Sequence, residues 1–123
     1  MWYREDAPTA PVREARRKIA EQPDDCAARL ELSGALIGLI ESDPAMAPRY
    51  AAELLQTLEV AVEIDPRSAE AWQGLAGYYL NAPPIAGGSL DKAEGAARKL
   101  LHLDPEIGRG LLAQVESRRS RGH

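Results

Sequence analysis

The chain has 123 residues, 45% of them hydrophobic, and a formal net charge of −4. One domain with a real core is expected at this length, and the acidic balance argues against nucleic acid as the main partner. No apolar run approaches the roughly 20 residues that span a bilayer, so direct membrane insertion is not expected. The single cysteine, Cys26, excludes an internal disulfide and is consistent with a reducing compartment.

Prolines and helix-capping residues divide the sequence into six stretches with helical periodicity. Apolar residues recur at i, i+3, i+4 and i+7 within them, for example at Leu54, Leu58, Ala61 and Val62. No stretch alternates apolar and polar residues with a period of two, and no Asn-Gly or Asp-Gly hairpin turn occurs. The fold class is therefore predicted to be all-α, with helices over residues 8–22, 26–41, 48–64, 68–80, 89–104 and 106–118.

The expected helices form pairs that repeat along the chain. Two apolar helix ends close in the same way, at Asp65-Pro66 and at Asp104-Pro105, 39 residues apart. A fainter stop at Pro23 lies 43 residues before Pro66. Helix pairs that recur at this spacing indicate a stacked repeat, because one pair alone cannot bury its apolar stripe.

Residues 69–79 carry a resemblance to a known family. This stretch resembles the first helix of a tetratricopeptide repeat (TPR), whose pattern W-x-x-L-G-x-x-Y corresponds here to Trp72, Leu75, Ala76 and Tyr79. Ala93 matches the small residue of the second helix. The earlier unit departs from the pattern, since Arg29 replaces the aromatic residue, Ser33 stands at a small position and Leu54 replaces the small alanine.

The resemblance implies a short α-solenoid in which antiparallel helix pairs stack. The best-matching unit has 39 residues against the family's roughly 34, and the excess lies in the Pro- and Gly-rich stretch 83–88. One TPR-like domain over residues 1–123 is expected. Its parts are a leading helix (8–22), a divergent repeat with a long insertion (24–66), the best-matching repeat (67–105), a capping helix (106–118) and a tail (119–123).

The sequence offers no recognisable catalytic or metal-binding constellation. His102 falls in the last turn of an expected helix, where a cation favours the helix dipole. Cys26 has no histidine near it in the sequence and is expected to act as a small buried hydrophobe. The Gly87-Gly88-Ser89 stretch before a helix lacks the spacing of a phosphate-binding P-loop. We therefore expect no enzyme activity, no cofactor and no metal.

The resemblance also implies where a partner would bind, since the first helices of TPR repeats line a concave groove. Carried over by position, the groove residues are Ala27, Leu30, Gly34, Ile37 and Gly38 in the first unit and Glu70, Gln73, Gly77, Leu80 and Asn81 in the second. Some family members clamp a terminal carboxylate there with polar side chains, but Leu30 and Gly34 at the corresponding places predict no such clamp. The groove glycines either admit a ligand closely or permit tight helix packing, and both interpretations stay open.

A second candidate surface is the inserted loop that carries Pro83, Pro84 and Ile85. Loops carry binding residues more often than cores do, and Ile85 is expected to be exposed there. A similar Pro-Pro…Gly-Gly-Ser insertion is found in some bacterial repeat proteins, including components associated with solute transport.

The leading functional hypothesis is a scaffold or adaptor that binds a peptide or helix of another protein in the groove. One alternative is a structural homo-oligomer, in which another copy fills the groove or covers an end helix. The other is an accessory subunit of a bacterial transport or secretion system that binds a small ligand. A cytoplasmic location is expected because the first residues contain no apolar signal region. A periplasmic location stays open if a signal precedes the sequence given.

Overall fold

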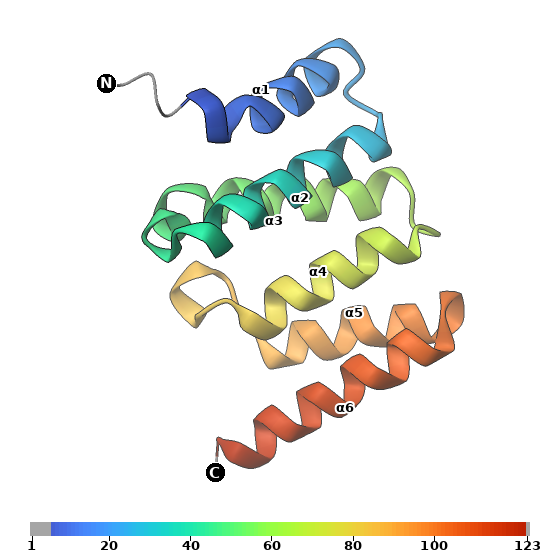
Figure 1. The fold of residues 1–123 in the computed structure, drawn as a ribbon. Coiled ribbons are helices and arrows are strands. Elements are labelled where there is room, and N and C mark those ends of the chain that lie inside the picture. Colours follow the sequence, from blue (N-terminus) through green and yellow to red (C-terminus); the bar gives the residue numbers. More distant parts are fainter. Residues whose placement is uncertain (1–5, 123) are drawn as a thin grey trace. The chain divides into compact units, whose positions relative to one another are not determined.

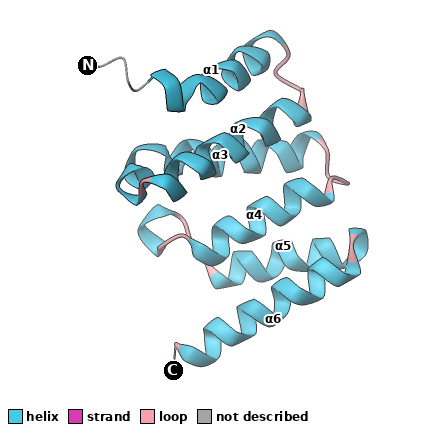
Figure 2. Cartoon of the chain, viewed as in Figure 1, coloured by secondary structure: helices cyan, strands magenta, loops and turns pink. Residues whose placement is uncertain are grey.

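The computed structural model describes residues 6–122, and within that range it contains six α-helices and no strand (Figures 1 and 2). The predicted all-α class is thus confirmed. In chain order the helices are α1 (Asp6–Glu21), α2 (Cys26–Ser42), α3 (Ala47–Ile64), α4 (Ala69–Asn81), α5 (Leu90–Leu103) and α6 (Pro105–Arg121). Two short 3-10 turns, η2 (Pro44–Met46) and η3 (Pro84–Ala86), lie in the longer connections. None of the described helices is both long and apolar enough to cross a membrane.

The ends of two helices differ by a few residues from the prediction. Helix α1 begins two residues before the predicted start at residue 8, and Pro11 lies inside it and leaves one main-chain hydrogen bond unmade. Helix α6 continues three residues beyond the predicted end at Arg118, as far as Arg121. Its last turn is rich in arginine, and cations at a helix C-terminus interact favourably with the carbonyl ends of the helix.

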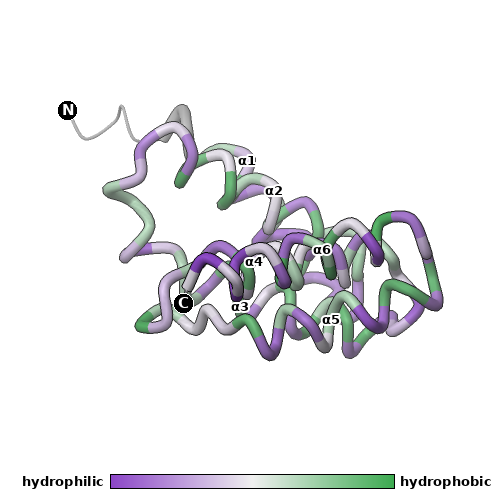
Figure 3. The backbone as a smooth tube through the Cα atoms, turned by 90° about the horizontal axis from the view of Figure 1, so that it is seen from below, coloured by the Kyte–Doolittle hydropathy of each residue, from purple (hydrophilic) through white to green (hydrophobic). Residues whose placement is uncertain are grey.

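The chain divides into two compact units between Ile64 and Asp65. The N-terminal unit contains α1, α2 and α3, with α2 packed against both of the others. The C-terminal unit contains α4, α5 and α6, with α5 packed against both of its neighbours. The division falls at Asp65-Pro66, where the sequence predicts the end of one helix pair and the start of the next. Hydrophobic and hydrophilic residues are mixed along the helices, as the colours of the tube in Figure 3 show.

Small and aliphatic side chains build the core of the N-terminal unit. Helix α1 contributes Val12 and Ala15, each at most 2% exposed, and they face α2. The remaining core side chains come from α2 and α3 and include Ala28, Leu32, Leu36, Leu54, Leu58 and Ala61. An ion pair also ties α1 to α3, because Arg16 Nε donates to Glu53 Oε2 at 2.9 Å.

The C-terminal unit is packed more closely, around alanines and a glycine. Its core includes Ala71, Leu75, Ala76, Tyr79, Ala93, Ala96, Ala97, Leu100 and Val115. Gly108 of α6 is buried so tightly that a Cβ added to it would lie 2.7 Å from the main-chain nitrogen of Leu101 on α5. The two backbones therefore approach as closely as they do only because residue 108 has no side chain.

Side-chain caps set most of the helix starts that the sequence predicts. Asp25 accepts a hydrogen bond from the amide of Ala28 at 3.0 Å, and Ser68 accepts one from Ala71 at 3.1 Å. The other two caps work in the same way, with Ser89 accepting from Lys92 at 3.1 Å and Asp104 from Ile107 at 3.3 Å. A cap of this kind contributes about 1 kcal/mol by satisfying an amide that lacks a partner within the helix.

Candidate partner-binding surfaces

The residues predicted for the first half of the groove lie along one face of α2. Ala27, Gly34 and Gly38 are exposed, and Leu30 and Ile37 are half-buried beside them. Their spacing of three, four and seven residues places them on the same side of the helix. This face is apolar and lies on the opposite side of α2 from its core residues.

The glycines of this face do not allow a close approach between helices of the N-terminal unit. A Cβ added to Gly34 or to Gly38 would find no heavy atom of the described N-terminal unit within 4 Å. Gly77, on α4, is equally uncrowded within the C-terminal unit. Gly108 is the opposite case, since its Cβ would collide with the backbone of α5. Of the two interpretations that the sequence leaves open, close helix packing inside a unit is therefore excluded for Gly34, Gly38 and Gly77.

The residues predicted for the second half of the groove lie on α4, with one exception. Glu70, Gln73 and Asn81 are exposed, and Gly77 is half-buried between them. Leu80, expected on the same face, is instead 5% exposed and belongs to the core. Position-by-position transfer from the family therefore does not give the exposure of Leu80.

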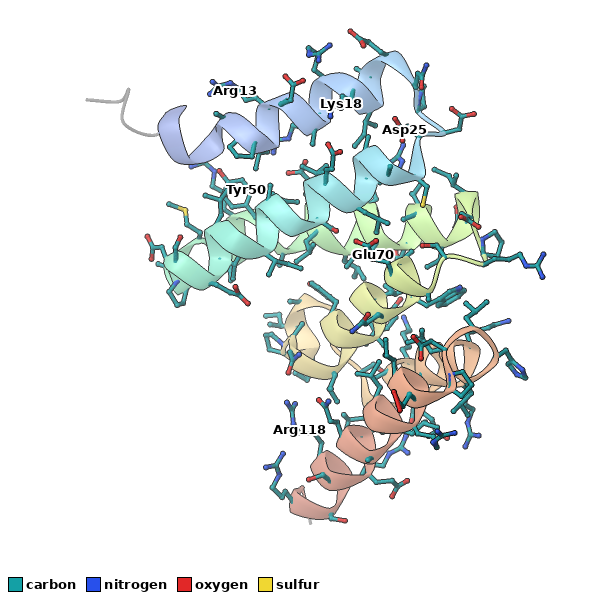
Figure 4. The ribbon with its side chains drawn as sticks, turned by 45° about the vertical axis from the view of Figure 1, so that its right-hand side comes forward. Arg13, Lys18, Asp25, Tyr50, Glu70 and Arg118 are labelled. Atoms are coloured by element: carbon teal, nitrogen blue, oxygen red, sulfur yellow. The ribbon has the colours of Figure 1, made fainter. Side chains whose placement is uncertain are left out.

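A polar cluster closes one end of the α4 face, and it involves a residue that sequence analysis missed. Arg118 of α6 donates from Nη1 to the main-chain oxygen of Leu80 at 2.8 Å and from Nη2 to Asn81 Oδ1 at 2.9 Å (Figure 4). Asn81 in turn donates from Nδ2 to the carbonyl oxygen of Gly77 at 2.9 Å. The guanidinium thus satisfies a carbonyl at the C-terminal end of α4, where carbonyls lack partners within the helix.

The neighbouring Arg119 joins α6 to α5. It donates to Glu94 Oε1 and to Asp91 Oδ1, both at 2.6 Å. The hydrogen bond from Arg119, followed by that from Arg98, lowers the pKa of Glu94 from its ordinary value of 4.5. Arg118, at the end of the predicted capping helix, and Arg119, in the predicted tail, therefore both bind partners within the C-terminal unit.

Hydrogen bonds hold the inserted loop, and its isoleucine is exposed to solvent. Ile85, in η3, is 96% exposed, and Pro83 and Pro84 before it are exposed as well. The hydroxyl of Tyr78 donates to the carbonyl oxygen of Ala86 at 2.6 Å. The amide of Gly88 donates to the Pro83 oxygen at 3.0 Å, which closes the turn. The prediction that Ile85 is exposed is therefore confirmed.

The conformation of this loop requires both of its glycines, Gly87 and Gly88. Gly87 has φ of 96°, a left-handed conformation that glycine adopts at little cost. A Cβ on Gly88 would lie 1.8 Å from the carbonyl oxygen of Ala82, so no side chain fits there. Ser89 then caps α5. The turn explains Gly87 and Gly88, and the helix cap explains Ser89, so none of the three residues needs a bound phosphate to account for it.

The described residues contain no group of three or more His, Cys, Asp or Glu side chains placed to hold a metal ion. Cys26 is half-buried, and its sulfur lies 3.6 Å from the carbonyl oxygen of Ala61 on α3. His102 is exposed on the last turn of α5.

No protein-family model matches the sequence, and no curated protein matches it. The resemblance to tetratricopeptide repeats accordingly depends on the residues quoted above, chiefly those of α4 and α5.

Proposed function

We propose that this chain is a protein-interaction module that binds a peptide or helix of a partner protein along the exposed faces of α2 and α4. One observation carries the proposal: Gly34, Gly38 and Gly77 lie in helices, on predicted binding faces, with open space where a side chain would be. The resemblance to tetratricopeptide repeats supports the same assignment, because α2 and α4 correspond to the first helices of its two repeats.

Glycine is unfavourable in a helix. Each glycine in a helix interior is about 1 kcal/mol less favourable than alanine. Gly108 offsets this cost by allowing α5 and α6 to approach, but Gly34, Gly38 and Gly77 make no such contact within their units. Unlike the equally open Gly95 and Gly110, these three lie on the predicted binding faces, where a missing side chain lets a ligand backbone approach closely.

The side chains around the glycines indicate what kind of segment would bind. On α2, the half-buried Leu30 and Ile37 offer an apolar surface. On α4, the exposed amide of Gln73 can donate to and accept from main-chain groups, whereas that of Asn81 already pairs with Gly77 and Arg118. A peptide or helix with one apolar stripe and accessible polar groups fits these two faces better than a charged terminus does.

The test is a set of leucine substitutions at the open glycines. We expect Gly34→Leu and Gly77→Leu to abolish recovery of the partner when the tagged protein is used as bait in cells of its own source. Since no described atom of its unit lies within 4 Å of either position, both variants should fold at least as stably as the wild type. Far-UV circular dichroism and thermal unfolding would confirm this.

Gly95→Leu is the matched control. Gly95 is an exposed helical glycine on α5 with nothing within 4 Å of its added Cβ, but it lies outside the proposed faces. A partner that is lost with Gly34→Leu and Gly77→Leu and retained with Gly95→Leu would support the proposal. Retention of the same partner by all three variants would refute it.

A further inference from the structure

The predicted binding face of α4 carries opposite charges at its two ends. We call this stripe the α4 face, and its residues, at positions i, i+3, i+7 and i+11, are Glu70, Gln73, Gly77 and Asn81. Glu70 lies at the first end, and Arg118 of α6 contacts the last residue, Asn81, at 2.9 Å (Figure 4). Residues 71–81 contain no Lys, Arg, Asp or Glu. A segment bound along this face therefore meets an anion at one end and a cation at the other.

The positive charge of Arg118 faces neutral groups. Its hydrogen bonds go to the main-chain oxygen of Leu80 at 2.8 Å and to the side-chain oxygen of Asn81. Among the residues that the structure describes, no Asp or Glu forms an ion pair with Arg118, whereas the adjacent Arg119 pairs with Glu94 and Asp91. A guanidinium has more N–H donors than these two bonds use. Arg118 can therefore bind a carboxylate of another molecule through charge-assisted hydrogen bonds.

The guanidinium of Arg118 is held in place before any ligand arrives. Asn81 accepts from it through Oδ1 and donates through Nδ2 to the carbonyl oxygen of Gly77 at 2.9 Å. These hydrogen bonds link the cation to the open glycine, which lies one helical turn from Asn81. A preorganised group loses little conformational entropy on binding. The positive end of the α4 face is therefore ready to receive an anion.

Glu70 supplies the negative end of the α4 face. It is exposed in the first turn of the helix, and no Lys or Arg of the described chain forms an ion pair with it. A carboxylate in a first turn also interacts favourably with the helix N-terminus. Because Glu70 is exposed, water and salt screen its charge. The half-buried Arg118 is therefore the stronger of the two charges in its effect on a ligand.

The length and chemistry of the α4 face favour an extended segment as its ligand. Glu70 and Asn81 are 11 residues apart in the sequence, so the ends of the face lie about 16 Å apart. An extended chain spans that distance in about five residues. The amide of Gln73 can pair with main-chain groups, which an extended segment leaves available and a helix uses internally. The open Gly77 gives the backbone of such a segment room to approach.

We propose that the α4 face orients an extended segment of the partner protein by charge. An Asp or Glu side chain of the segment pairs with Arg118, and a Lys or Arg side chain about five residues away pairs with Glu70. This inference rests on the proposed function, because it describes the segment bound at the same site. Exchanging the acidic and basic residues of the segment would bring like charges together at both ends, so the exchanged segment binds more weakly.

The first experiment selects binders from random peptides of about twelve residues, which are long enough to span the face. The peptides are displayed inside a carrier protein, so that no chain end is free. Binders that are lost with Gly77→Leu occupy the α4 face. We expect these peptides to share an acidic and a basic residue about five positions apart, in one fixed order. Binders selected on Arg118→Gln should keep the preference for the basic residue and lose that for the acidic one.

The second experiment measures one selected peptide, with acetylated and amidated ends, against the peptide in which its acidic and basic residues are exchanged. Fluorescence anisotropy should give the selected order a Kd about tenfold lower. The difference should shrink at about 1 M salt, where the Debye length is about 3 Å. Arg118→Gln should remove most of the difference and Glu70→Gln a smaller part. Arg118→Lys, which keeps the positive charge, should retain it.

Two matched controls carry the same neutralisations away from the α4 face. Arg109→Gln changes an exposed arginine nine residues before Arg118, on the opposite side of α6. Glu63→Gln changes an exposed glutamate of α3. Both variants should prefer the selected peptide as the wild type does. Loss of the preference in either control would show that the overall charge of the protein, and not the α4 face, determines it.

The outcomes separate this inference from the proposed function. Peptides that are lost with Gly77→Leu but share no charge order would overturn the inference alone, and so would a difference in Kd that survives Arg118→Gln. Loss of the difference with Arg118→Lys as well as with Arg118→Gln would also overturn it, because Arg118 would then act only by holding the end of α4. If Gly77→Leu releases none of the selected peptides, the inference and the proposed function both fail.

Discussion

At the scale of single residues, the same amino acid has opposite roles at different helical positions. Gly108 is required by its surroundings, since the backbone of α5 occupies the place of its side chain. Gly110, two residues later in the same helix, is exposed and uncrowded. Burial and near neighbours, which the local sequence does not contain, determine which role a glycine has.

This contrast predicts the effect of adding one methyl group. Gly108→Ala should lower the free energy of unfolding by about 1–3 kcal/mol, because the new Cβ overlaps the main chain of Leu101. Gly110→Ala should instead raise it by up to about 1 kcal/mol through helix propensity alone. Urea denaturation followed by circular dichroism measures both changes. Equal effects from the two substitutions would contradict the close packing of α5 and α6.

The Glu94 carboxylate predicts how the C-terminal unit responds to acid. Its pKa is lowered in the folded protein by the hydrogen bond from Arg119 and then by that from Arg98. A carboxylate with a depressed folded pKa adds stability that is present above its unfolded value of 4.5 and is lost as the pH falls through the folded value. Unfolding midpoints of wild type and Glu94→Gln should therefore converge below pH 4.5, with the wild type more stable above it. A difference that is independent of pH would show that the ion pairs with Glu94 do not form in solution.

At the scale of the elements, capped helix starts could be predicted and long-range contacts could not. Ser68, Ser89 and Asp104 act within three residues of their own positions, so local rules identify them. Pro11 lies inside α1, as it does inside the predicted leading helix over 8–22, because a helix tolerates a proline early in its length. Arg118 was missed since its partner carbonyl on Leu80 is 38 residues away in the sequence. Only the packed unit brings those two residues together.

The connection between α4 and α5 should loosen when one hydroxyl is removed. Tyr78→Phe deletes the hydrogen bond to the carbonyl oxygen of Ala86 and leaves the ring in place. We expect a loss of about 1 kcal/mol in stability and faster hydrogen exchange at the amides of Gly88 and Ser89. Exchange at Ala93, within α5, serves as the internal reference. Unchanged exchange at the two loop amides would show that the turn is held by its main-chain bonds alone.

At the scale of the whole molecule, the sequence predicts the number, order and approximate ends of the helices. One domain over residues 1–123 was expected, and the boundary between its two predicted repeats coincides with the boundary between the two compact units. Asp65-Pro66 marks that boundary because a proline disfavours the helical conformation of the residue before it, so the preceding helix ends there. The binding surfaces were predicted less completely. Positions inferred from the repeat pattern identify Gln73 as exposed, but they place Leu80 on the same face, and its side chain is in the core.

The connection between α5 and α6 is too short to change in length without moving a helix. Asp104 ends one helix and caps the next, so a single residue separates the two. One extra residue inserted there would turn α6 by about 100° about its own axis, which would move Gly108 off the α5 backbone and Arg119 away from Glu94. The loop at 83–85, by contrast, extends into solvent and can change in length without moving a helix. Relatives of this protein should therefore vary in length in that loop and keep the α5–α6 joint constant.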